Sequence, residues 1–553
     1  MPARAVDYLV QAVEALGVRH VFGVDGANIE DLYDAIFEHP GELTGVVAKH
    51  EFSAATMADG YARVTGDLGV MAATSGGGAM NLVAGLAESF ASRVPVLALV
   101  GQAPTGAAGK GAFQDSSGLA GTFDAARLFA PITRYCARVE SAGELPDLLH
   151  RAVIAARGGG PAVLLLPKDI QQAALELVTP FAPLPAVRVR DVAGIARVRS
   201  ALRAASATGK IALIAGDQVA RDGARAELLQ LAAALDATVG VAPDAKDVYH
   251  HDDPGFCGVA GTMGHPELVD AVRRSALCLL IGTRMPVTAR TGLDEALAHT
   301  TVASLSAEPP YLDTVHATST DLAADLTELA AAFETPAPAP APPTAERELT
   351  RLPVPDATGP GLRYRDIVET LNAAIEPGAD VFVDAGNTGA AVVHHLRLPR
   401  AGRFVVALGM GGMGYAFGAG IGSAFARARR TFVVAGDGAF FMHGMEIHTA
   451  IEYRLPVTFL VFNNNAHAMC ITREQIYYGD RYSFNRFQPA HLGAGVGAMF
   501  PGLPAYSPSS VEELAHALRS CMDGDGPSFI SIECDPDEIP PFSPFLSEPR
   551  RHP

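Results

Sequence analysis

The chain has 553 residues, of which 49% are hydrophobic and 18% charged, a composition that favours several globular domains and excludes a largely disordered chain. Its formal net charge of −18 argues against a nucleic-acid partner, because the phosphates of nucleic acid require clustered Lys and Arg side chains. The six cysteines form no CxxC pair, and no segment is apolar enough for a signal peptide or a membrane span, so we expect a cytoplasmic protein without disulfides.

Residues 1–178 alternate apolar strand patterns with helical patterns. The strand patterns lie at 17–24, 68–78, 94–102 and 161–169. Such alternation predicts a parallel, doubly wound sheet, in which ligands bind at the carboxyl ends of the strands. The segment 49–66 is predicted to be one helix that begins at Glu51, with a face of small residues that suits burial against another element.

Two further α/β units follow along the chain. Residues 190–333 form a central unit, residues 334–359 a linker and residues 360–553 a third unit. The linker begins with a dense Pro–Ala alternation, which suits neither a helix nor a central strand. The buried strand patterns of the two units lie at 210–218, 276–284, 379–389, 429–441 and 455–465. The predicted fold class is therefore α/β, with three doubly wound parallel-sheet domains.

The third unit has the strongest functional signal in the sequence. One apolar strand ends in Gly-Asp-Gly at 436–438, a helical pattern follows, and the next apolar strand ends in three asparagines at 463–465. Asn464 follows Asp437 by 27 residues, the length of one strand–helix–strand crossover, so both are expected at one edge of the sheet. A carboxylate, an amide oxygen and a backbone carbonyl suit Mg²⁺, and the start of a helix suits phosphate. Either motif alone is more often an ordinary turn or loop, but this spacing favours a site for Mg²⁺ and a diphosphate.

This arrangement resembles the diphosphate-binding signature of the thiamine-diphosphate enzymes. The resemblance extends over nearly the whole chain and is closest to the acetolactate (acetohydroxyacid) synthase branch. It implies thiamine diphosphate and Mg²⁺ as cofactors, and the decarboxylation of a 2-oxo acid with transfer of the remaining fragment. The implied Mg²⁺ ligands are Asp437, Asn464 and the carbonyl of Ala466. The implied diphosphate contacts are Gly386, Asn387, Thr388, Gly436, Gly438 and Ala439.

The resemblance also implies a site for the aminopyrimidine ring of the cofactor. Glu51 matches the family's activating glutamate, which hydrogen-bonds a ring nitrogen and so promotes proton removal from the thiazolium. A lone glutamate is otherwise most often a solvated surface charge. In the glycine-rich run 408–422, Met413 matches the apolar side chain that bends the cofactor, and the carbonyl of Gly411 matches the acceptor for the ring amine. Close helix packing is a second use of such a run, compatible with the first. The further implied contacts are Gly26, Thr74 and Asn81.

One short motif separates the branches of the family. Phe113 and Gln114 follow Glu51 at the spacing at which acetolactate synthases and pyruvate oxidases have Phe-Gln. Simple 2-oxo acid decarboxylases have a His-His pair there that supplies a proton, and its absence favours carboligation. Lys168 matches a lysine of the synthases, with a strand-end lysine that faces water as the alternative. The run 282–291 lacks the two acids of the FAD-binding synthases, so we expect no FAD.

The residues beyond the asparagine triplet are expected to face the substrate. A gapless alignment places Arg473 where the synthases have a tryptophan that lines the acceptor pocket. An arginine there suits an acceptor with a carboxylate or phosphate, and an ordinary surface arginine is the equally weighted alternative. The other residues expected beside the substrate or the cofactor are His467, Met469 and Cys470.

The leading hypothesis is an acetolactate-synthase-like carboligase that joins a 2-oxo acid, with pyruvate as the first choice, to a second carbonyl compound. The first alternative is a non-oxidative 2-oxo acid decarboxylase that releases an aldehyde. The second alternative, from another class, is a non-catalytic cofactor-binding subunit. Glu51 and Asp437 lie in different units, and the family joins these halves across a subunit interface, so we expect a homodimer or homotetramer. We expect neither nucleic acid nor a membrane as a partner.

Overall fold

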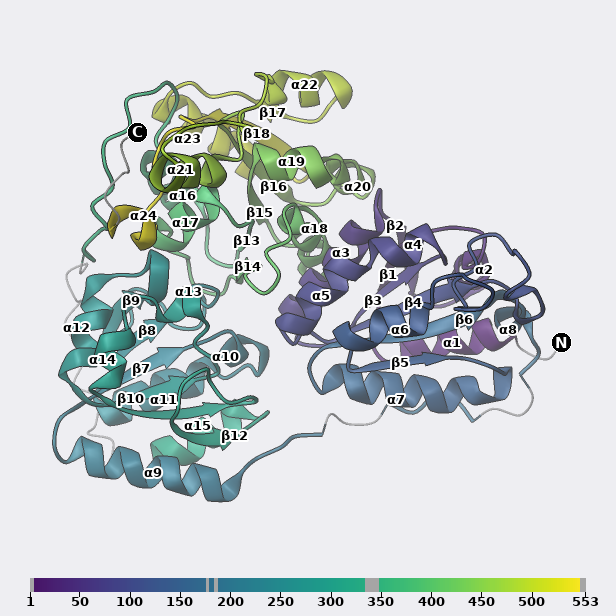
Figure 1. The fold of residues 1–553 in the computed structure, drawn as a ribbon, viewed down its shortest axis with the longest axis horizontal. Helices are drawn as coiled ribbons and strands as arrows, with labels where there is room; N and C mark the ends of the chain where they lie inside the picture. The colour runs from purple at the N-terminus through teal and green to yellow at the C-terminus, as the bar shows by residue number, and fades with distance from the viewer. Residues whose placement is uncertain (1–3, 176–178, 184–186, 334–347, 548–553) are drawn as a thin grey trace.

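The computed structural model describes residues 4–175, 179–183, 187–333 and 348–547, arranged as three α/β domains (Figure 1). Each domain has a six-stranded sheet, and every strand pairing within the sheets is parallel. The predicted fold class is therefore confirmed. Most of the predicted linker, 334–347, lies outside the described residues. No helix among the described residues is long and apolar enough to cross a membrane.

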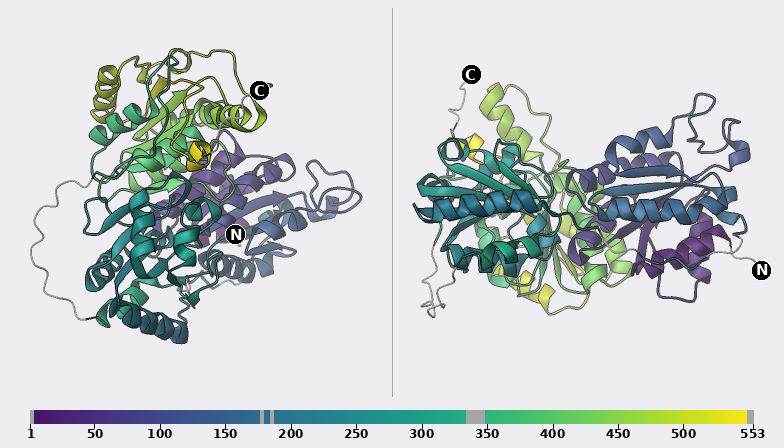
Figure 2. Two further views of the ribbon diagram at one scale, coloured as in Figure 1. Left: turned by 60° about the vertical axis from the view of Figure 1, so that its left-hand side comes forward. Right: turned by 90° about the horizontal axis from the view of Figure 1, so that it is seen from below.

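The first domain lies on one side of the molecule, and the central and third domains lie on the other (Figures 1 and 2). Its strand order is β2-β1-β3-β4-β6-β5. Its strands are β1 (His20–Val24), β2 (Thr44–Val47), β3 (Gly69–Ala73), β4 (Val96–Gln102), β5 (Tyr135–Arg138) and β6 (Pro161–Pro167). Its helices are α1 (Ala5–Ala15), α2 (Glu30–Glu38), α3 (Glu51–Thr65), α4 (Gly77–Asn81), α5 (Val83–Ala91), α6 (Ala125–Phe129), α7 (Leu145–Arg157) and α8 (Lys168–Gln172).

The central domain has a different strand order, β12-β11-β10-β7-β8-β9. Its strands are β7 (Lys210–Ala215), β8 (Thr238–Val241), β9 (Phe256–Val259), β10 (Ser275–Ile281), β11 (Thr301–Ser306) and β12 (Val315–Thr318). Its helices are α9 (Val192–Ser206), α10 (Gln218–Arg221), α11 (Arg225–Leu235), α12 (Pro266–Arg274), α13 (Val287–Arg290), α14 (Asp294–Ala298) and α15 (Leu322–Ala331).

The third domain repeats the order of the first, as β14-β13-β15-β16-β18-β17. Its strands are β13 (Asp380–Val383), β14 (Phe404–Val406), β15 (Thr431–Gly436), β16 (Val457–Asn463), β17 (Ala505–Tyr506) and β18 (Ser528–Glu533). Its helices are α16 (Tyr364–Ala374), α17 (Asn387–His395), α18 (Tyr415–Arg427), α19 (Asp437–His443), α20 (Ile447–Glu452), α21 (Ala468–Tyr478), α22 (Leu492–Met499), α23 (Val511–Met522) and α24 (Ser543–Ser547).

The inner strands are continuous apolar runs because helices cover both faces of each sheet. Every residue of β3, β4 and β16 is buried. Valine, leucine and alanine dominate these runs, which is the composition expected of parallel strands buried on both sides. The Pro-rich C-terminal segment packs against the third domain. Ile539 and Phe545 are buried and pack with Ile476 of α21, because their apolar side chains bury better there than in water.

Helices α3 and α18 cross closely and join the first domain to the third (Figure 1). A methyl group on Gly422 would lie 2.0 Å from the carbonyl oxygen of Met57, and one on Gly60 would lie 2.1 Å from that of Ala419. These glycines therefore permit backbone contact that no larger residue allows. Tyr415 adds a hydrogen bond from its hydroxyl to the buried carboxylate of Asp59.

Ion pairs between domains complete the assembly of the chain. Arg403 of the third domain is buried and pairs with Asp217 and Asp247 of the central domain. Arg93 and Arg134 of the first domain both pair with Glu308 of the central domain. A buried charge that loses its partner is strongly destabilising, so these contacts favour one relative placement of the three domains.

Candidate functional site

Asp437 lies where the sequence places it, at the end of β15 and the start of α19. Its side chain is 1% exposed, and the backbone N–H of Ala466 donates to its Oδ2 at 3.0 Å. That bond joins the loops that follow β15 and β16, which are adjacent parallel strands. Burial raises the pKa of Asp437 to about 7, although several backbone N–H donors, the nearest that of Ala466, act in the opposite direction. A divalent cation beside this carboxylate would favour its charged form.

Asn464 presents an amide oxygen without a partner. Its Nδ2 donates to the hydroxyl of Tyr364 at 3.2 Å, whereas its buried Oδ1 has no hydrogen-bond partner among the described residues. The next residue, Asn465, has a φ of 51°, a conformation that asparagine tolerates, and it turns the chain toward Ala466. Because an unpaired buried oxygen is costly, this set of oxygens fits a hard cation such as Mg²⁺.

A cradle for a diphosphate lies beside these oxygens. Gly386 precedes α17 with a φ of 95°, and a methyl group on it would meet no atom within 4 Å. Thr388 Oγ1 would lie 3.7 Å from a methyl group on Gly436, so the starts of α17 and α19 face one space. Asn387 is buried, and its Oδ1 has no partner among the described residues. Two helix N-termini with free N–H groups suit an anion in that space.

Met413 and His467 border the same space. A methyl group on Gly438 would lie 2.6 Å from His467 Cδ2 and 3.1 Å from Met413 Cε, so only glycine leaves both side chains in place. Gly411 has a φ of 65° and open space around its Cα. Ala439 is buried in the first turn of α19, as its predicted position requires.

Two residues that support this half of the site are absent from the sequence-based prediction. Asp384 accepts hydrogen bonds from the backbone N–H groups of Gly414 and Ala416, at 2.8 and 2.9 Å, and so fixes the loop of Met413. Burial raises the pKa of Asp384 to about 6. Tyr364 orients Asn464, as described above. The one available signal for Asp384 is an acid at the end of a predicted strand, two residues before Gly386 of the Gly-Asn-Thr run.

The first domain gathers a second group of predicted residues at the carboxyl ends of β1, β2 and β3. Glu51 is buried at the start of α3, and Asn81 Nδ2 donates to its Oε2 at 2.9 Å. A methyl group on Gly78 would lie 2.9 Å from Thr74 Cγ2 and 3.1 Å from Glu51 Oε1. Thr74 also lies against Gly26, since a methyl group there would be 2.9 Å from the threonine side chain. The structure thus brings Gly26, Glu51, Thr74 and Asn81 together.

The Phe-Gln pair joins this group from the loop after β4. Thr74 Oγ1 donates to Gln114 Oε1 at 3.1 Å, and Gln114 has a φ of 58°. A non-glycine residue in that region is uncommon and often marks a functional loop. The side chain of Phe113 is 75% exposed, in contrast to the buried phenylalanines of the sheets.

Lys168 contacts neither Glu51 nor its partner Asn81. Its ammonium group pairs with Glu30 at 2.5 Å and Asp31 at 3.2 Å, and it also donates to the carbonyl of Ala27 at 2.9 Å. These contacts hold α2 to the end of β6. The lysine therefore neither faces water alone nor bonds to another predicted site residue.

The residues predicted to face the substrate differ in exposure. Arg473 on α21 is exposed and has no ion pair among the described residues. Cys470 is partly exposed on the same helix, and Met469 packs against Ile476 and Phe545. Within the described chain, the only hydrogen-bond or ion-pair partner of Glu51 is Asn81, so no such contact joins Glu51 to the predicted site residues of the third domain.

Comparisons with known proteins agree with this arrangement. Residues 3–120 match the N-terminal TPP binding domain of the thiamine pyrophosphate enzymes. Residues 195–333 match their central domain, and residues 384–532 match their C-terminal TPP binding domain. The chain belongs to the thiamine pyrophosphate enzymes. The family resemblance inferred from the sequence is therefore confirmed, and the protein is an enzyme that depends on thiamine diphosphate, the same cofactor under its other name.

Curated relatives place this thiamine diphosphate enzyme beside the acetolactate synthases. A probable acetolactate synthase large subunit of Methanocaldococcus jannaschii is 28% identical, over 98% of this chain and 93% of the relative. The acetolactate synthase isozyme 2 large subunit of Escherichia coli is 27% identical, over 96% and 95%. A solved structure of a Rhodococcus jostii thiamine diphosphate-dependent 4-hydroxybenzoylformate decarboxylase has a TM-score of 0.79 and 20% identity, and covers 96% of this chain and 99% of its own. At that identity the similarity concerns the fold.

Proposed function

We propose that this enzyme decarboxylates a 2-oxo acid and transfers the remaining fragment to a second carbonyl compound, as acetolactate synthases do. The observation on which the proposal rests most is the Phe113–Gln114 pair, because Gln114 contacts Thr74 in the group of residues around Glu51. The named relatives support the same branch of the family.

Asp437, Asn464 and the carbonyl of Ala466 would hold Mg²⁺, because they offer a buried carboxylate, a free amide oxygen and a backbone oxygen at one sheet edge. The N–H groups of Gly436, Gly438 and Ala439 and those of Gly386, Asn387 and Thr388 would receive the diphosphate. Met413 would hold the cofactor in its bent conformation, and the carbonyl of Gly411 would accept a hydrogen bond from the ring amine. Met469 would lie nearby. When bound, thiamine diphosphate would supply a nucleophilic carbon for the 2-oxo acid and an electron sink for the electron pair left behind when CO₂ departs.

Glu51 would hydrogen-bond the aminopyrimidine ring through the carboxyl oxygen that Asn81 does not hold. Its burial at the start of α3 keeps water from competing for that bond. Asn81 fixes the carboxyl group by donating to Oε2. Glu51 is therefore the residue that we expect to promote proton movement at the cofactor.

Gln114 would favour carboligation because an amide can donate a hydrogen bond but cannot act as an acid near neutral pH. A reactive fragment that is not protonated survives long enough to meet an acceptor. Phe113, largely exposed in one chain, would cover the fragment from water once another surface closes over it. Arg473, His467 and Cys470 would then contact the acceptor, with the exposed guanidinium of Arg473 binding a carboxylate or phosphate group. No substrate role is assigned to Lys168, which two acids already hold.

We propose that the enzyme works without FAD. In the segment 282–291, where FAD-binding synthases have two acids, Arg284 pairs with Glu308 and lies over the ring of Tyr311. Spectra of the purified holoenzyme would decide this point, since bound flavin gives a characteristic visible absorption band.

We also propose that two chains build each site. Within one chain no hydrogen bond or ion pair among the described residues joins Glu51 to the third domain, and large apolar side chains lie exposed around both halves. These side chains are Met80, Phe113, Met410, Phe441, Met442 and Met445. A homodimer or homotetramer would cover them.

A mixed-subunit experiment tests this arrangement. Glu51→Gln and Asp437→Asn chains, each inactive alone, are co-expressed so that mixed dimers form. If sites are shared between chains, each mixed dimer has one intact site, and the mixture recovers roughly a quarter of the wild-type activity. Activity that stays at the level of the single variants would contradict a shared site.

The product test addresses the function itself. The holoenzyme is incubated with pyruvate alone and with a panel of 2-oxo acids and carbonyl acceptors, and the products are identified by mass spectrometry. A 2-hydroxy-3-oxo acid or an acyloin supports the proposal. Free aldehyde as the main product in every combination would replace it with simple decarboxylation.

A further inference from the structure

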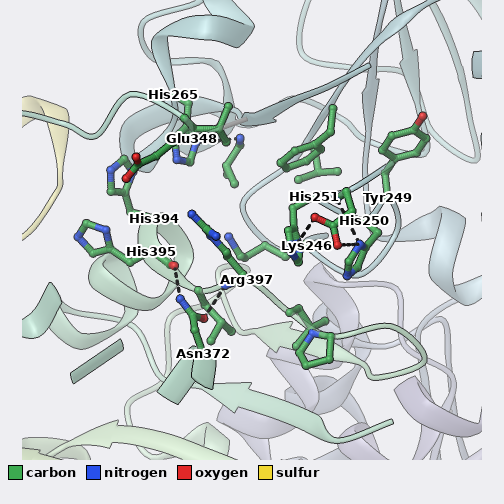
Figure 3. A pocket seen from close by; sticks show the side chains of 18 of the residues that line it. Lys246, Tyr249, His250, His251, His265, Glu348, Asn372, His394, His395 and Arg397 are labelled. Carbon is green, nitrogen blue, oxygen red and sulfur yellow. Dashed lines mark hydrogen bonds and ion pairs between the residues drawn. The ribbon is translucent and has the colours of Figure 1, made fainter. Parts of the chain in front are cut away.

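A cavity of about 810 Å³ lies between the central and third domains, away from both halves of the site described above. The loop after β8 and the start of α12 line one wall, and the C-terminal end of α17 and the loop that follows it line another (Figure 3). Five histidines line this cavity, out of 17 in the whole chain. Such a concentration of imidazoles is unexplained by the proposed reaction.

Two of these histidines have structural partners that account for them. His394 bonds through Nδ1 to the carbonyl of Met263 at 3.0 Å, and its Nε2 accepts from the backbone N–H of Leu352 at 3.1 Å. His265 Nδ1 accepts from the N–H of Val259 at 3.1 Å, and its ring stacks on that of His394 at 4.5 Å. These rings hold the domain junction in place.

The pair His250 and His251 differs from them. The two rings lie 4.0 Å apart between centroids, and both face the carboxylate of Asp252. One ligand atom from each of the three residues falls within 4.8 Å of the other two. We propose that His250, His251 and Asp252 bind one divalent transition-metal ion of the zinc class, at a site separate from the Mg²⁺ site.

The spacing of the ligand atoms supports this proposal. His251 Nε2 lies 3.4 Å from Asp252 Oδ1, and His250 Nδ1 lies 3.5 Å from Asp252 Oδ2. Ligand atoms at about 2.0 Å from a zinc ion with tetrahedral angles are separated by about 3.3 Å. The two histidine–aspartate separations are therefore close to those of a tetrahedral site, and all three ligand atoms lie within 4.8 Å of one another.

The second support is the hydrogen bonding of His250. Its Nδ1 accepts a long bond from the backbone N–H of Asp252 at 3.2 Å, so the ring proton lies on Nε2, and the residue also has a backbone hydrogen bond with Leu398. A histidine that binds metal through one nitrogen usually donates from the other to a carbonyl or carboxylate, which fixes the ring. The metal would replace the long bond at Nδ1.

The chemistry of the site favours zinc-like ions over Mg²⁺. Two imidazoles and one carboxylate are a ligand set for borderline metals, whereas Mg²⁺ prefers oxygen alone. The fourth position would face the cavity, where Lys246 lies and donates from its ammonium group to the carbonyl of Val393 at 2.6 Å (Figure 3).

The alternative is that Asp252 merely forms weak surface ion pairs with the two rings. Its side chain is 57% exposed, and such pairs contribute little. The two interpretations differ in one measurable property, which is the affinity of the loop for a transition metal when the Mg²⁺ site is already full.

The test uses the full chain, stripped of metal with a chelator and then saturated with Mg²⁺ and thiamine diphosphate. Zn²⁺ is titrated by calorimetry, and Co²⁺ is titrated by visible absorption, which reports a tetrahedral site. We expect one ion per chain in the wild type, and an affinity at least about tenfold lower in both His251→Ala and Asp252→Asn. Zn²⁺ should also raise the thermal midpoint of the wild type but not that of the variants.

Two controls make the outcome specific. His299→Ala removes an exposed histidine of the central domain outside the cavity and should bind Zn²⁺ as the wild type does. Asp437→Asn should also keep Zn²⁺ binding, since its carboxylate belongs to the other metal site. Without metal, each variant must have the same thermal midpoint of unfolding as the metal-free wild type. No Zn²⁺ binding by the wild type, or equal affinity in His251→Ala and Asp252→Asn, would overturn the proposal.

Discussion

The first and third domains have one strand order but place different chemistry at the ends of equivalent strands. After the third strand in sequence, the first domain has Thr74 and a short glycine-rich turn, whereas the third domain has Asp437. After the second strand, the first domain has Glu51 and the third has the loop of Met413. One half thus offers a single buried carboxyl group among neutral side chains, and the other offers free oxygens and helix N-termini.

This difference shows that the sheet only supplies positions, while the loops decide what binds there. The third domain suits a metal and an anion because the amide oxygens of Asn387 and Asn464 lack hydrogen-bond partners among the described residues and lie near the buried carboxylate of Asp437. The first domain suits a neutral ring because Glu51 keeps one oxygen free beside small residues. The central domain, with another strand order, contributes no residue to either predicted half.

The largest expected effect comes from the first domain. Glu51→Gln keeps the shape of the side chain but removes its acid–base function, so we expect turnover with pyruvate to fall by about 10² to 10⁴-fold. Cofactor binding should remain, because the proposed anion and metal contacts lie elsewhere. The measurements are steady-state turnover and hydrogen–deuterium exchange at C2 of bound thiamine diphosphate.

The matched control for this variant is Glu295→Gln, an exposed glutamate of the central domain, which should leave both quantities unchanged. Turnover within threefold of wild type in Glu51→Gln would remove Glu51 from the proposed role. Exchange in the wild type no faster than in free cofactor would instead support a non-catalytic subunit.

In the third domain we expect a loss of cofactor binding. Asp437→Asn should weaken retention of thiamine diphosphate with Mg²⁺ by more than about 100-fold, since a residue that only supports a metal ligand already contributes about 10 to 100-fold. Calorimetric titration of the cofactor measures this directly. Asp525→Asn, at an exposed position of the same domain, is the control. If Asp437→Asn binds cofactor normally but turns over slowly, the assigned difference between the two halves is wrong.

A smaller effect is expected on the ratio of carboligation products to aldehyde. Replacement of Phe113 and Gln114 by histidines introduces groups that can deliver a proton, so the aldehyde share of the products should rise about tenfold. Histidine tolerates the φ of 58° at position 114 better than most residues do. Gln114→Asn, which keeps an amide, should leave the product ratio near that of the wild type. An unchanged ratio in the double variant would show that this loop does not control the fate of the fragment.

The sequence predicts most of the long buried strands and the acid–amide pair at one sheet edge, since both follow from apolar runs and crossover length. It misses β11 and β18, although most of their residues are buried. It does not predict the short edge strands β2, β14 and β17, because two to four residues are too few to give a clear pattern. Asp384 and Tyr364 are also missed. They act through hydrogen bonds to residues 30 and 100 positions away, which local periodicity does not report.

The smallest effect concerns the contact that joins the two compared domains. Gly422→Ala would place a methyl group 2.0 Å from the carbonyl oxygen of Met57, so α3 and α18 must separate, and we expect a loss of about 1–3 kcal/mol in the free energy of unfolding. Gly495→Ala, on the exposed face of α22 with no atom within 4 Å, should instead stabilise the chain by about 0.5–1 kcal/mol through helix propensity. Denaturant unfolding of both variants measures the difference. Because α3 follows Glu51 and α18 follows the Met413 loop, Gly422→Ala should also lower turnover. Equal stabilities of the two variants would show that this glycine contact does not hold the first and third domains together.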